Sequence, residues 1–221
     1  MPVEDLQQWE DRACAEEAAA QAAAESGDAG TALQKERDAA ESWKRVGIDA
    51  RDIAQNEQWR TKADLVCRSA RAWLRAAEAF RRASRHVRPT DAAEADRLLN
   101  EAGLLLRDAA AVFEECARER TACGDHDAAR GSLVYAEACL VAARGLLAGD
   151  AAQVQQIDEQ LRRVREALEE ARRRSRKVAK MPGGKKQKGK KTVVRRKKGR
   201  PVLAKATRRV KKRAAAKKRR G

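Results

Sequence analysis

The sequence predicts an all-α protein: a long antiparallel helical bundle with coiled-coil-like seams, followed by a disordered basic C-terminal tail. First, residues 1–170 are dominated by Ala, Leu, Glu, Arg and Gln, which favour helices, and no stretch alternates as a strand does. Second, apolar residues recur in steps of three and four. Third, residues 171–221 hold 26 Lys and Arg and no acidic residue. We therefore expect a helical domain over 1–178 and a tail over 179–221.

The first two helices are predicted from turn residues. The first helix should run from about Val3 to Glu25 and end in the turn-rich segment 26–30. Thr31 followed by Gln34 is typical of a capping box, which predicts the start of the second helix. Gly47 predicts its end.

The third helix is predicted to begin at about Ile48 or Asn56 and to reach Arg88. Its seam positions are separated alternately by four and three residues, which is a heptad pattern. We interpret the tryptophans on this seam as packing residues rather than as a ligand pocket. The seam comprises Trp59, Ala63, Val66, Ala70, Trp73, Ala77, Phe80, Ser84 and Val87.

Asp91 with Glu94 predicts the cap of the fourth helix. This helix carries a small residue at every seventh position, and such residues allow two helix axes to approach closely. The small residues are Ala95, Ala102, Ala109 and Cys116, interleaved with Leu98/Leu99, Leu105/Leu106 and Val112/Phe113.

Two further turns divide the rest of the body. Gly124-Asp125 predicts a reversal before the fifth helix, whose seam continues in heptad register. Gly149-Asp150 predicts the start of a sixth helix that ends at about Lys180. Since the connections are short, neighbouring helices should be antiparallel. The fifth seam is Ala129, Leu133, Ala136, Leu140, Ala143 and Leu147, and the sixth is Val154, Ile157, Leu161, Val164, Leu168 and Ala171.

The seam of the sixth helix is narrower than the others, as in an edge helix or a dimerising helix. We favour the edge helix because it needs no partner.

The body shows no chemistry typical of an enzyme. Adjacent acidic pairs such as Glu114-Glu115 point in different directions on a helix, and no nucleotide-binding or metalloprotease motif occurs. The number of cysteines is odd, at five, and no Cys-x-x-Cys pair occurs, which argues against a disulfide framework. The two histidines lie in different segments, which argues against a metal site. We predict free, buried cysteines, no catalytic residue, no cofactor and no small-molecule substrate.

One stretch of the body resembles a tetratricopeptide repeat, although generic antiparallel packing produces similar spacings and Val141 stands where that family usually has Pro. Ala76, Phe80 and Ala83 with Pro89 resemble part of a second repeat, but the period does not continue through the chain. The resemblance implies a protein–protein adaptor. The residues that carry it are Phe113, Cys116, Ala117, Gly124, Asp125, Ala129, Leu133 and Ala136.

The tail is the strongest indication of function. Residues 1–170 carry 24 basic and 33 acidic residues, a net charge of −9, and residues 171–221 carry +26, which together give the net charge of +17. Such arms bind polyanions because they release counterions from phosphates. The tail resembles the Lys/Ala-rich tails of linker histones and bacterial histone-like proteins, which implies sequence-independent binding to nucleic acid, with DNA favoured over RNA.

Within the tail, Lys197-Lys198-Gly199-Arg200-Pro201 resembles an AT-hook, although Lys198 replaces an Arg of that motif. The resemblance implies that Arg200 reaches the floor of an A·T-rich minor groove. Basic clusters such as Arg195–Lys198 also fit a nuclear import signal. A merely solubilising tail is a further reading. Binding of the tail to an anionic membrane surface is the least favoured interpretation, because the tail lacks Trp and Phe.

The sequence thus predicts a nucleic-acid-binding protein in the nucleus, bacterial nucleoid or cytoplasm, neither secreted nor membrane-bound. Its body is expected to act as a scaffold or as a docking module for a protein partner or a second copy. The alternative is a tetratricopeptide-like adaptor whose tail is a localisation signal. The predicted nucleic-acid-binding residues are Lys185, Lys186, Lys188, Lys190, Lys191, Arg195, Arg196, Lys197, Lys198, Gly199, Arg200, Pro201, Arg208, Arg209, Lys211, Lys212, Arg213, Lys217, Lys218, Arg219 and Arg220.

Overall fold

The computed structural model describes residues 3–180, with side chains over residues 5–173, and this part of the chain is all-α, as predicted. Residues Met1–Lys180 belong to one compact unit. Six helices and no strand are found in the described range. The helices are α1 (Val3–Glu25), α2 (Ala29–Ala54), α3 (Trp59–Val87), α4 (Ala92–Ala122), α5 (His126–Leu146) and α6 (Ala151–Lys180).

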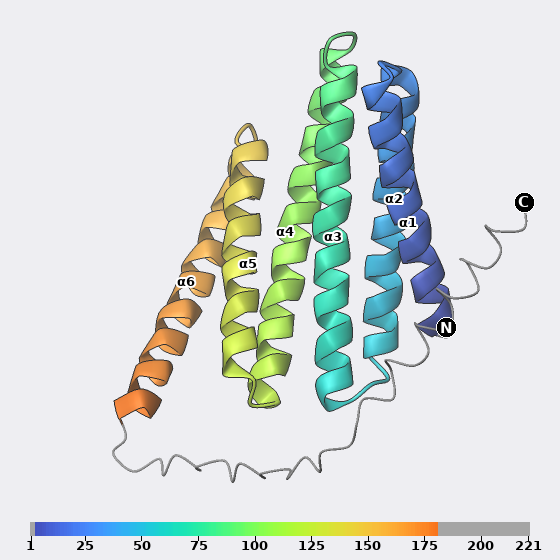
Figure 1. Ribbon diagram of the computed structural model, residues 1–221. Coiled ribbons are helices and arrows are strands. Elements are labelled where there is room, and N and C mark those ends of the chain that lie inside the picture. The colour runs from blue at the N-terminus through green and yellow to red at the C-terminus, as the bar shows by residue number, and fades with distance from the viewer. Residues whose placement is uncertain (1–2, 181–221) are drawn as a thin grey trace, which may run out of the picture. The chain divides into compact units, whose positions relative to one another are not determined.

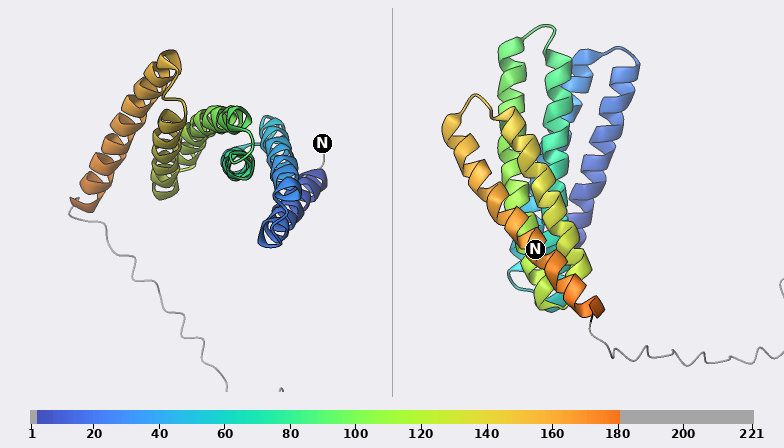
Figure 2. Two further views of the ribbon diagram at one scale, coloured as in Figure 1. Left: turned by 90° about the horizontal axis from the view of Figure 1, so that it is seen from above. Right: turned by 90° about the vertical axis from the view of Figure 1, so that its left-hand side faces the viewer.

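The helices lie side by side in the order of the chain, and each runs antiparallel to the next (Figure 1). The view from above shows them in a row from α1 to α6 (Figure 2). Every helix packs mainly on its neighbours in sequence, so α1 and α6 form the two edges of the row. The predicted antiparallel bundle is confirmed, and so is the position of the sixth helix at its edge.

Small residues set the spacing between the helices. Ala95, Ala102, Ala109 and Cys116 of α4 are all fully buried, as the heptad pattern predicts. A Cβ atom at Gly103 would lie 2.7 Å from Cγ of Leu147, so only glycine allows this approach. The seams are therefore close helix contacts of the kind that short side chains permit.

Aspartate side chains begin the later helices as predicted. Asp91 accepts a hydrogen bond from the backbone N–H of Glu94, and Asp125 accepts one from Ala128. Asp150 accepts from Ala152 and Gln153. These carboxylates satisfy backbone donors that have no partner within the helix.

The predicted cap of the second helix was wrong by three residues. Asp28, rather than Thr31, is the cap, and it accepts hydrogen bonds from both the backbone N–H and the hydroxyl of Thr31. Gly27 precedes it with a φ of 81°, a conformation that favours glycine.

Two helix boundaries also differ from the prediction. The second helix continues through Gly47 to Ala54. A Cβ atom at Gly47 would lie 2.8 Å from Nε1 of Trp73, so this glycine serves close packing rather than a helix end. The third helix begins only at Trp59, and the Trp59 side chain is 75% exposed instead of lying on the seam. Trp73 is half-buried and packs against the core, as predicted.

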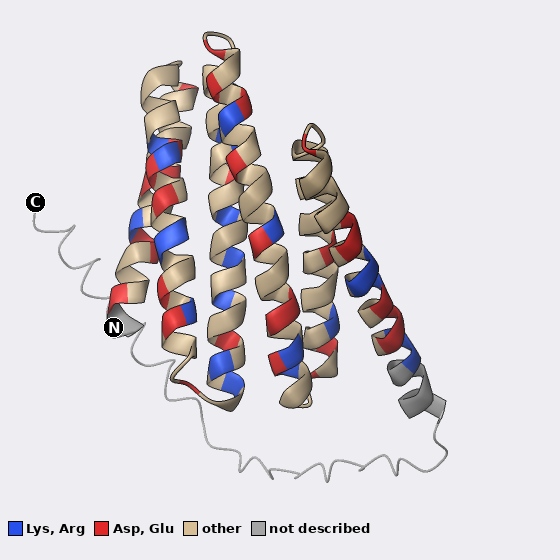
Figure 3. Ribbon diagram, turned by 180° about the vertical axis from the view of Figure 1, so that it is seen from behind, with Lys and Arg blue, Asp and Glu red and all other residues tan. Residues whose placement is uncertain are grey.

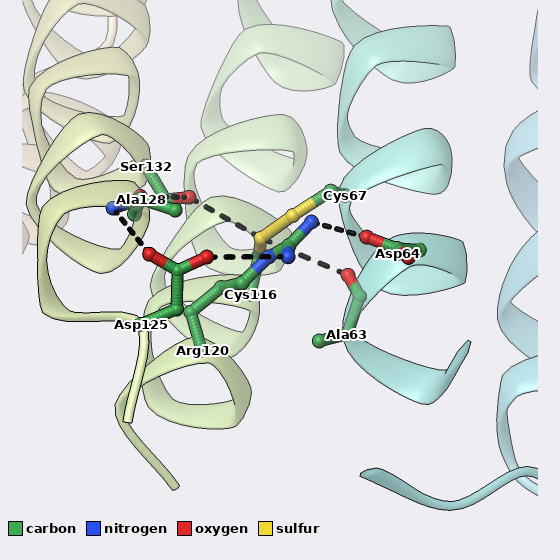
Figure 4. Close-up of polar contacts among 8 residues, drawn as sticks. All are labelled: Ala63, Asp64, Cys67, Cys116, Arg120, Asp125, Ala128 and Ser132. Carbon is green, nitrogen blue, oxygen red and sulfur yellow. Dashed lines mark hydrogen bonds and ion pairs between the residues drawn. A yellow bond between two sulfur atoms is a disulfide. The ribbon is translucent and has the colours of Figure 1, made fainter. Parts of the chain in front are cut away.

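The cysteines differ from the prediction as well. Cys67 of α3 and Cys116 of α4 form a disulfide whose Cα atoms are 5.4 Å apart (Figure 4). Cys116 lies on the seam of α4, and Cys67 directly follows the seam residue Val66 of α3, so the packing of these two helices brings the two cysteines together. Cys14 and Cys139 are free, Cys14 exposed and Cys139 buried, and Cys123 is free and half-buried.

Candidate nucleic-acid interface

All 21 predicted nucleic-acid-binding residues, Lys185–Arg220, lie outside the described residues, and so does the AT-hook-like segment. The structure does describe the place where the charge of the chain changes. Glu169 and Glu170 are the last acidic residues, and they lie within α6. The helix then continues without a break to Lys180, so the first residues of the basic segment are helical.

One face of α6 fixes it to the body. Ile157, Leu161, Val164 and Leu168 are buried, each at most 5% exposed. Ion pairs add to this contact: Arg144 of α5 lies 2.7 Å from Asp158, and Arg165 lies 2.7 Å from Glu137 of α5. The base of the basic segment is therefore attached to the body by both apolar and charged contacts.

The C-terminal end of α6 stands away from the rest of the body. It has 30 residues whereas α5 has 21, which corresponds to an excess length of roughly 13 Å at 1.5 Å per residue. Figures 1 and 2 show α6 leaning away from α5 towards this end. Among the described residues, Arg172 pairs only with Glu169 of its own helix, and Arg173 forms no ion pair. The basic residues that follow Glu170 thus begin on an exposed helical extension.

The cations of the body itself are largely paired with acidic residues of the body. On α2, Arg37, Lys44 and Arg51 stand seven residues apart, and they pair with Glu94, Glu101 and Glu115 of α4. Figure 3 shows basic and acidic residues interspersed along the helices. These pairs link helices that are two apart in the chain, and they leave few cations of α2 available for an external anion.

A second ladder of ion pairs joins α1 to α3. Arg68, Arg75 and Arg82 stand seven residues apart on α3 and pair with Glu10 and Glu17 of α1. Neither ladder was predicted from the sequence. The seven-residue spacing of the basic residues was the available signal, because it places them on one helix face.

The environment of Cys139 on α5 makes this thiol unreactive. Burial, and to a smaller extent the nearby carboxylate of Glu78, raises the pKa of Cys139 to about 12. The thiolate is the nucleophilic form, so Cys139 is not a candidate nucleophile.

Two open hollows on the described surface lie along α6. A hollow of about 850 Å³ lies along α6, and its described lining is Leu161 together with charged residues of both signs. A second hollow of about 730 Å³ lies at the other end of the same helix. No cluster of His, Cys, Asp and Glu suited to a metal ion is found among residues 5–173. The helices described here include none with the length and apolarity needed to cross a membrane.

Sequence reasoning also missed two exposed features. Trp59 lies at the beginning of α3, and Val134, Tyr135 and Val141 are each more than half exposed on α5. The ring of Tyr135 stacks on Phe113 of α4 at 5.4 Å between centroids. The helical spacing of Val134 and Val141, seven residues apart and off the seam of α5, was the available signal.

Comparison with known proteins gives no functional assignment. No protein-family model matches the chain, and no curated protein is similar to it. A solved structure titled "DHF58 filament" is 20% identical, with a TM-score of 0.31, and the match covers 78% of this chain and 99% of that one. The de novo designed helical repeat protein DHR64 is 21% identical, with a TM-score of 0.34, over 82% of this chain and 100% of that one.

Proposed function

We propose that the chain binds nucleic acid, DNA in preference to RNA, through its basic C-terminal arm, and that the helical body is the scaffold that carries the arm. The observation behind this proposal is the separation of charge at Glu170. Residues 171–221 contain 26 Lys and Arg and no acidic residue, whereas residues 1–170 contain 24 basic and 33 acidic residues. A run of cations without acidic neighbours is suited to the displacement of counterions from phosphates.

The ion pairs of the body support this division of roles. Arg37, Lys44 and Arg51 of α2 are held by glutamates of α4, and Arg68, Arg75 and Arg82 of α3 by glutamates of other helices. A cation in such a pair must lose its carboxylate partner before it can bind a phosphate. The arm contains no acidic residue, so its cations can bind phosphates without first losing a carboxylate partner within the arm.

Helix α6 supports the proposal as the base of the arm. Its apolar face is buried against the body, and its C-terminal end carries Arg172 and Arg173 on exposed positions. Lysine and arginine near a helix C-terminus also interact favourably with the helix dipole. We infer that α6 anchors the arm to the body. Within the arm, Gly199-Arg200-Pro201 would insert into an A·T-rich minor groove while the remaining cations contact phosphates.

The test compares the full chain with residues 1–178, which fall within the compact unit Met1–Lys180. Fluorescence anisotropy with a short labelled DNA duplex at physiological salt measures both dissociation constants, and a duplex RNA of the same length measures the preference for DNA. We expect truncation to weaken binding by at least about 100-fold, because nearly all phosphate contacts are lost. Equal affinities for the full and the truncated chain would refute the proposal.

A protein–protein adaptor is the second candidate, and Trp59 favours it. A tryptophan that is 75% exposed is uncommon on a surface without a partner, and tryptophan is enriched at interaction sites. In this case the basic arm would be a localisation signal. If the chain is an adaptor, residues 1–178 would still bind the protein partner. If it acts by binding nucleic acid, this truncation would remove that binding.

A further inference from the structure

The disulfide between Cys67 and Cys116 joins the two middle helices of the row. It links α3 to α4 and closes a loop of 49 residues. An ion pair between Arg120 of α4 and Asp64 of α3 lies beside it (Figure 4). The ion pair is independent of redox conditions, whereas the disulfide is not. The contact between α3 and α4 therefore has one component that a reductant can remove.

The two sulfur atoms of this bond have different surroundings. Cys116 is fully buried, whereas Cys67 is 8% exposed. The hydroxyl oxygen of Ser132 on α5 lies 3.2 Å from Sγ of Cys116, and the carbonyl oxygen of Ala63 lies 3.9 Å from the same sulfur. Among the described residues, none forms a hydrogen bond with Sγ of Cys67. Only Cys116 thus has polar neighbours that can respond to a change in its charge.

The same polar groups suit Cys116 after reduction. As a thiol, Cys116 can donate its S–H to the carbonyl oxygen of Ala63 or to the Ser132 hydroxyl. As a thiolate, it can accept a hydrogen bond from that hydroxyl, which also donates to the carbonyl of Ala128 at 3.1 Å and reaches the sulfur by rotation about its C–O bond. Reduction therefore leaves the buried sulfur with a partner, and the helices need not separate.

Cys67 is the sulfur that a reagent reaches first. It lies about two turns into α3, and the start of this helix has no side-chain cap, because Gln58 makes no capping hydrogen bond. The backbone nitrogen of Lys62 lies 3.5 Å from the carbonyl oxygen of Gln58, which is long for a hydrogen bond. Local opening of these first turns exposes Cys67, while Cys116 stays covered by Ser132 of α5.

We propose that the bond between Cys67 and Cys116 is a redox-sensitive cross-link between α3 and α4, which a small anionic thiol of the glutathione class breaks and re-forms. The charge near Cys67 suits such a thiol. Arg71 lies one turn after Cys67 on α3, is exposed and forms no ion pair among the described residues. Its guanidinium group attracts the carboxylates of the thiol. The nearby carboxylate of Asp64 is neutralised by Arg120.

Reduction proceeds in two exchange steps. A thiolate attacks Sγ of Cys67 and forms a mixed disulfide, and the electron pair of the broken S–S bond leaves on Cys116, whose thiolate accepts a hydrogen bond from Ser132. A second thiolate attacks the sulfur of the small thiol in this mixed disulfide, and Cys67 leaves as a thiolate. The two small thiols are oxidised to one disulfide and the protein disulfide is reduced. The protons lost by the two small thiols are gained by the two cysteines.

The cross-link should couple the stability of the body to redox conditions. A bond that closes a loop of 49 residues lowers the equilibrium constant of unfolding by roughly 100- to 1000-fold, because it restricts the unfolded chain. By thermodynamic linkage, folding favours the bond over the reduced pair by the same factor. The effect is measured on the protein alone, so it does not depend on nucleic-acid binding.

A glutathione titration of the full chain tests the coupling. In a background with Cys14→Ser, Cys123→Ser and Cys139→Ala, the ratio of reduced to oxidised glutathione is varied in buffer and in concentrated urea. Mass spectrometry after acid quenching and alkylation measures the oxidised fraction. We expect the native chain to keep the bond at a ratio of [GSH]² to [GSSG] roughly 100- to 1000-fold higher than the unfolded chain does. Equal midpoints, or a native chain that forms no bond, would overturn the proposal.

Replacement of Ser132 by Ala tests the role of its hydroxyl. We expect glutathione to reduce the native variant about 10-fold more slowly, because the Cys116 thiolate loses a charge-assisted hydrogen bond, and the rate in urea to stay unchanged. Ser84→Ala is the matched control, since Ser84 is buried and its hydroxyl donates to the carbonyl of Arg81 in its own helix. Equal reduction rates for the two variants would contradict the assignment of Cys116 as the leaving sulfur.

Single cysteine variants identify the sulfur that is attacked. In the same background, Cys116→Ser and Cys67→Ser are incubated separately with oxidised glutathione, and circular dichroism checks that both are folded. We expect a slow gain of one glutathione on Cys67 in the first variant, through local opening of α3, and a gain on Cys116 in the second variant only in urea. A native Cys116 that reacts as fast as Cys67, or no adduct on native Cys67, would refute the proposed route.

Discussion

Arg82 of α3 binds Glu36 of α2 and thereby holds three helices together. Its Nε donates a hydrogen bond to Glu36 at 2.7 Å, and its Nη2 donates one to Glu17 of α1, also at 2.7 Å. The side chain of Glu36 is only 6% exposed. Burial acts to lower the pKa of Arg82, but the hydrogen bonds with Glu36 and Glu17 outweigh it and the net pKa is raised. Arg82 therefore supplies a permanent positive charge to a buried carboxylate.

Replacement of Arg82 by Met should destabilise the body. The change leaves the Glu36 carboxylate buried without its cation, which costs about 2–4 kcal/mol in the free energy of unfolding. Urea denaturation at neutral pH measures this loss. Arg71→Met is the control, since Arg71 is exposed and forms no ion pair among the described residues. Equal stabilities of the two variants would show that the Arg82 network contributes nothing.

Enlargement of the α4 seam should also destabilise the body. Ala102 is fully buried, so Ala102→Leu forces the neighbouring helix away and costs about 1–3 kcal/mol. Thermal melting measures the effect, and Ala22→Leu on the exposed face of α1 is the control, with little expected change. If Ala102→Leu left the midpoint unchanged, the close contact along α4 would be wrong.

The cysteines should differ in their reaction with iodoacetamide. Cys14 is exposed and should be alkylated in the native protein. Cys139, whose pKa is raised to about 12 by burial, should react only after unfolding, because almost none of it is thiolate at neutral pH. Cys67 and Cys116 should be alkylated only after reduction and unfolding. Mass spectrometry of native, denatured and reduced samples separates these classes, and alkylation of native Cys139 would contradict the structure.

The sequence predicted the helices well where local signals were clear. Asp91, Asp125 and Asp150 each follow a distinct break in the helical pattern, and each is a helix cap in the structure. The segment 26–31 offers two candidates, Asp28 and Thr31, and local propensity does not decide between them. The structure selects Asp28, with Thr31 as one of its donors.

Errors occurred where tertiary packing overrides local propensity. Gly47 weakens a helix by its own propensity, yet it is required inside α2 by the indole of Trp73, which lies 26 residues further along the chain. Trp59 matches the period of the α3 seam, but the helix begins at this residue, so no neighbouring helix covers it. Neither the contact between Gly47 and Trp73 nor the exposure of Trp59 can be predicted from the periodicity of the sequence.

The separation of charge at Glu170, and therefore the candidate arm, could be predicted from the sequence alone. The pairing of the body cations could not, because it depends on which helices lie side by side. The partners Arg51 and Glu115 are 64 residues apart in the chain.

The AT-hook-like segment gives a test of sequence preference. Arg200→Ala should reduce the preference of the full chain for A·T-rich over G·C-rich duplexes, because only the minor-groove contact depends on the base pair. Total affinity should change little, since one cation of 26 is removed. Competition anisotropy with the two duplexes measures both quantities. Equal losses on both duplexes would mean that Arg200 contacts phosphate only.

The salt dependence of DNA binding tests whether the arm binds through phosphates. If a third of its 26 cations engage phosphates, the plot of log K against log salt concentration should have a slope of roughly −8, at about −0.9 for each phosphate neutralised. The body, residues 1–178, serves as the control in the same titration. A slope near −1 for the full chain, equal to that of the body, would contradict the account, because the arm would then make almost no phosphate contacts.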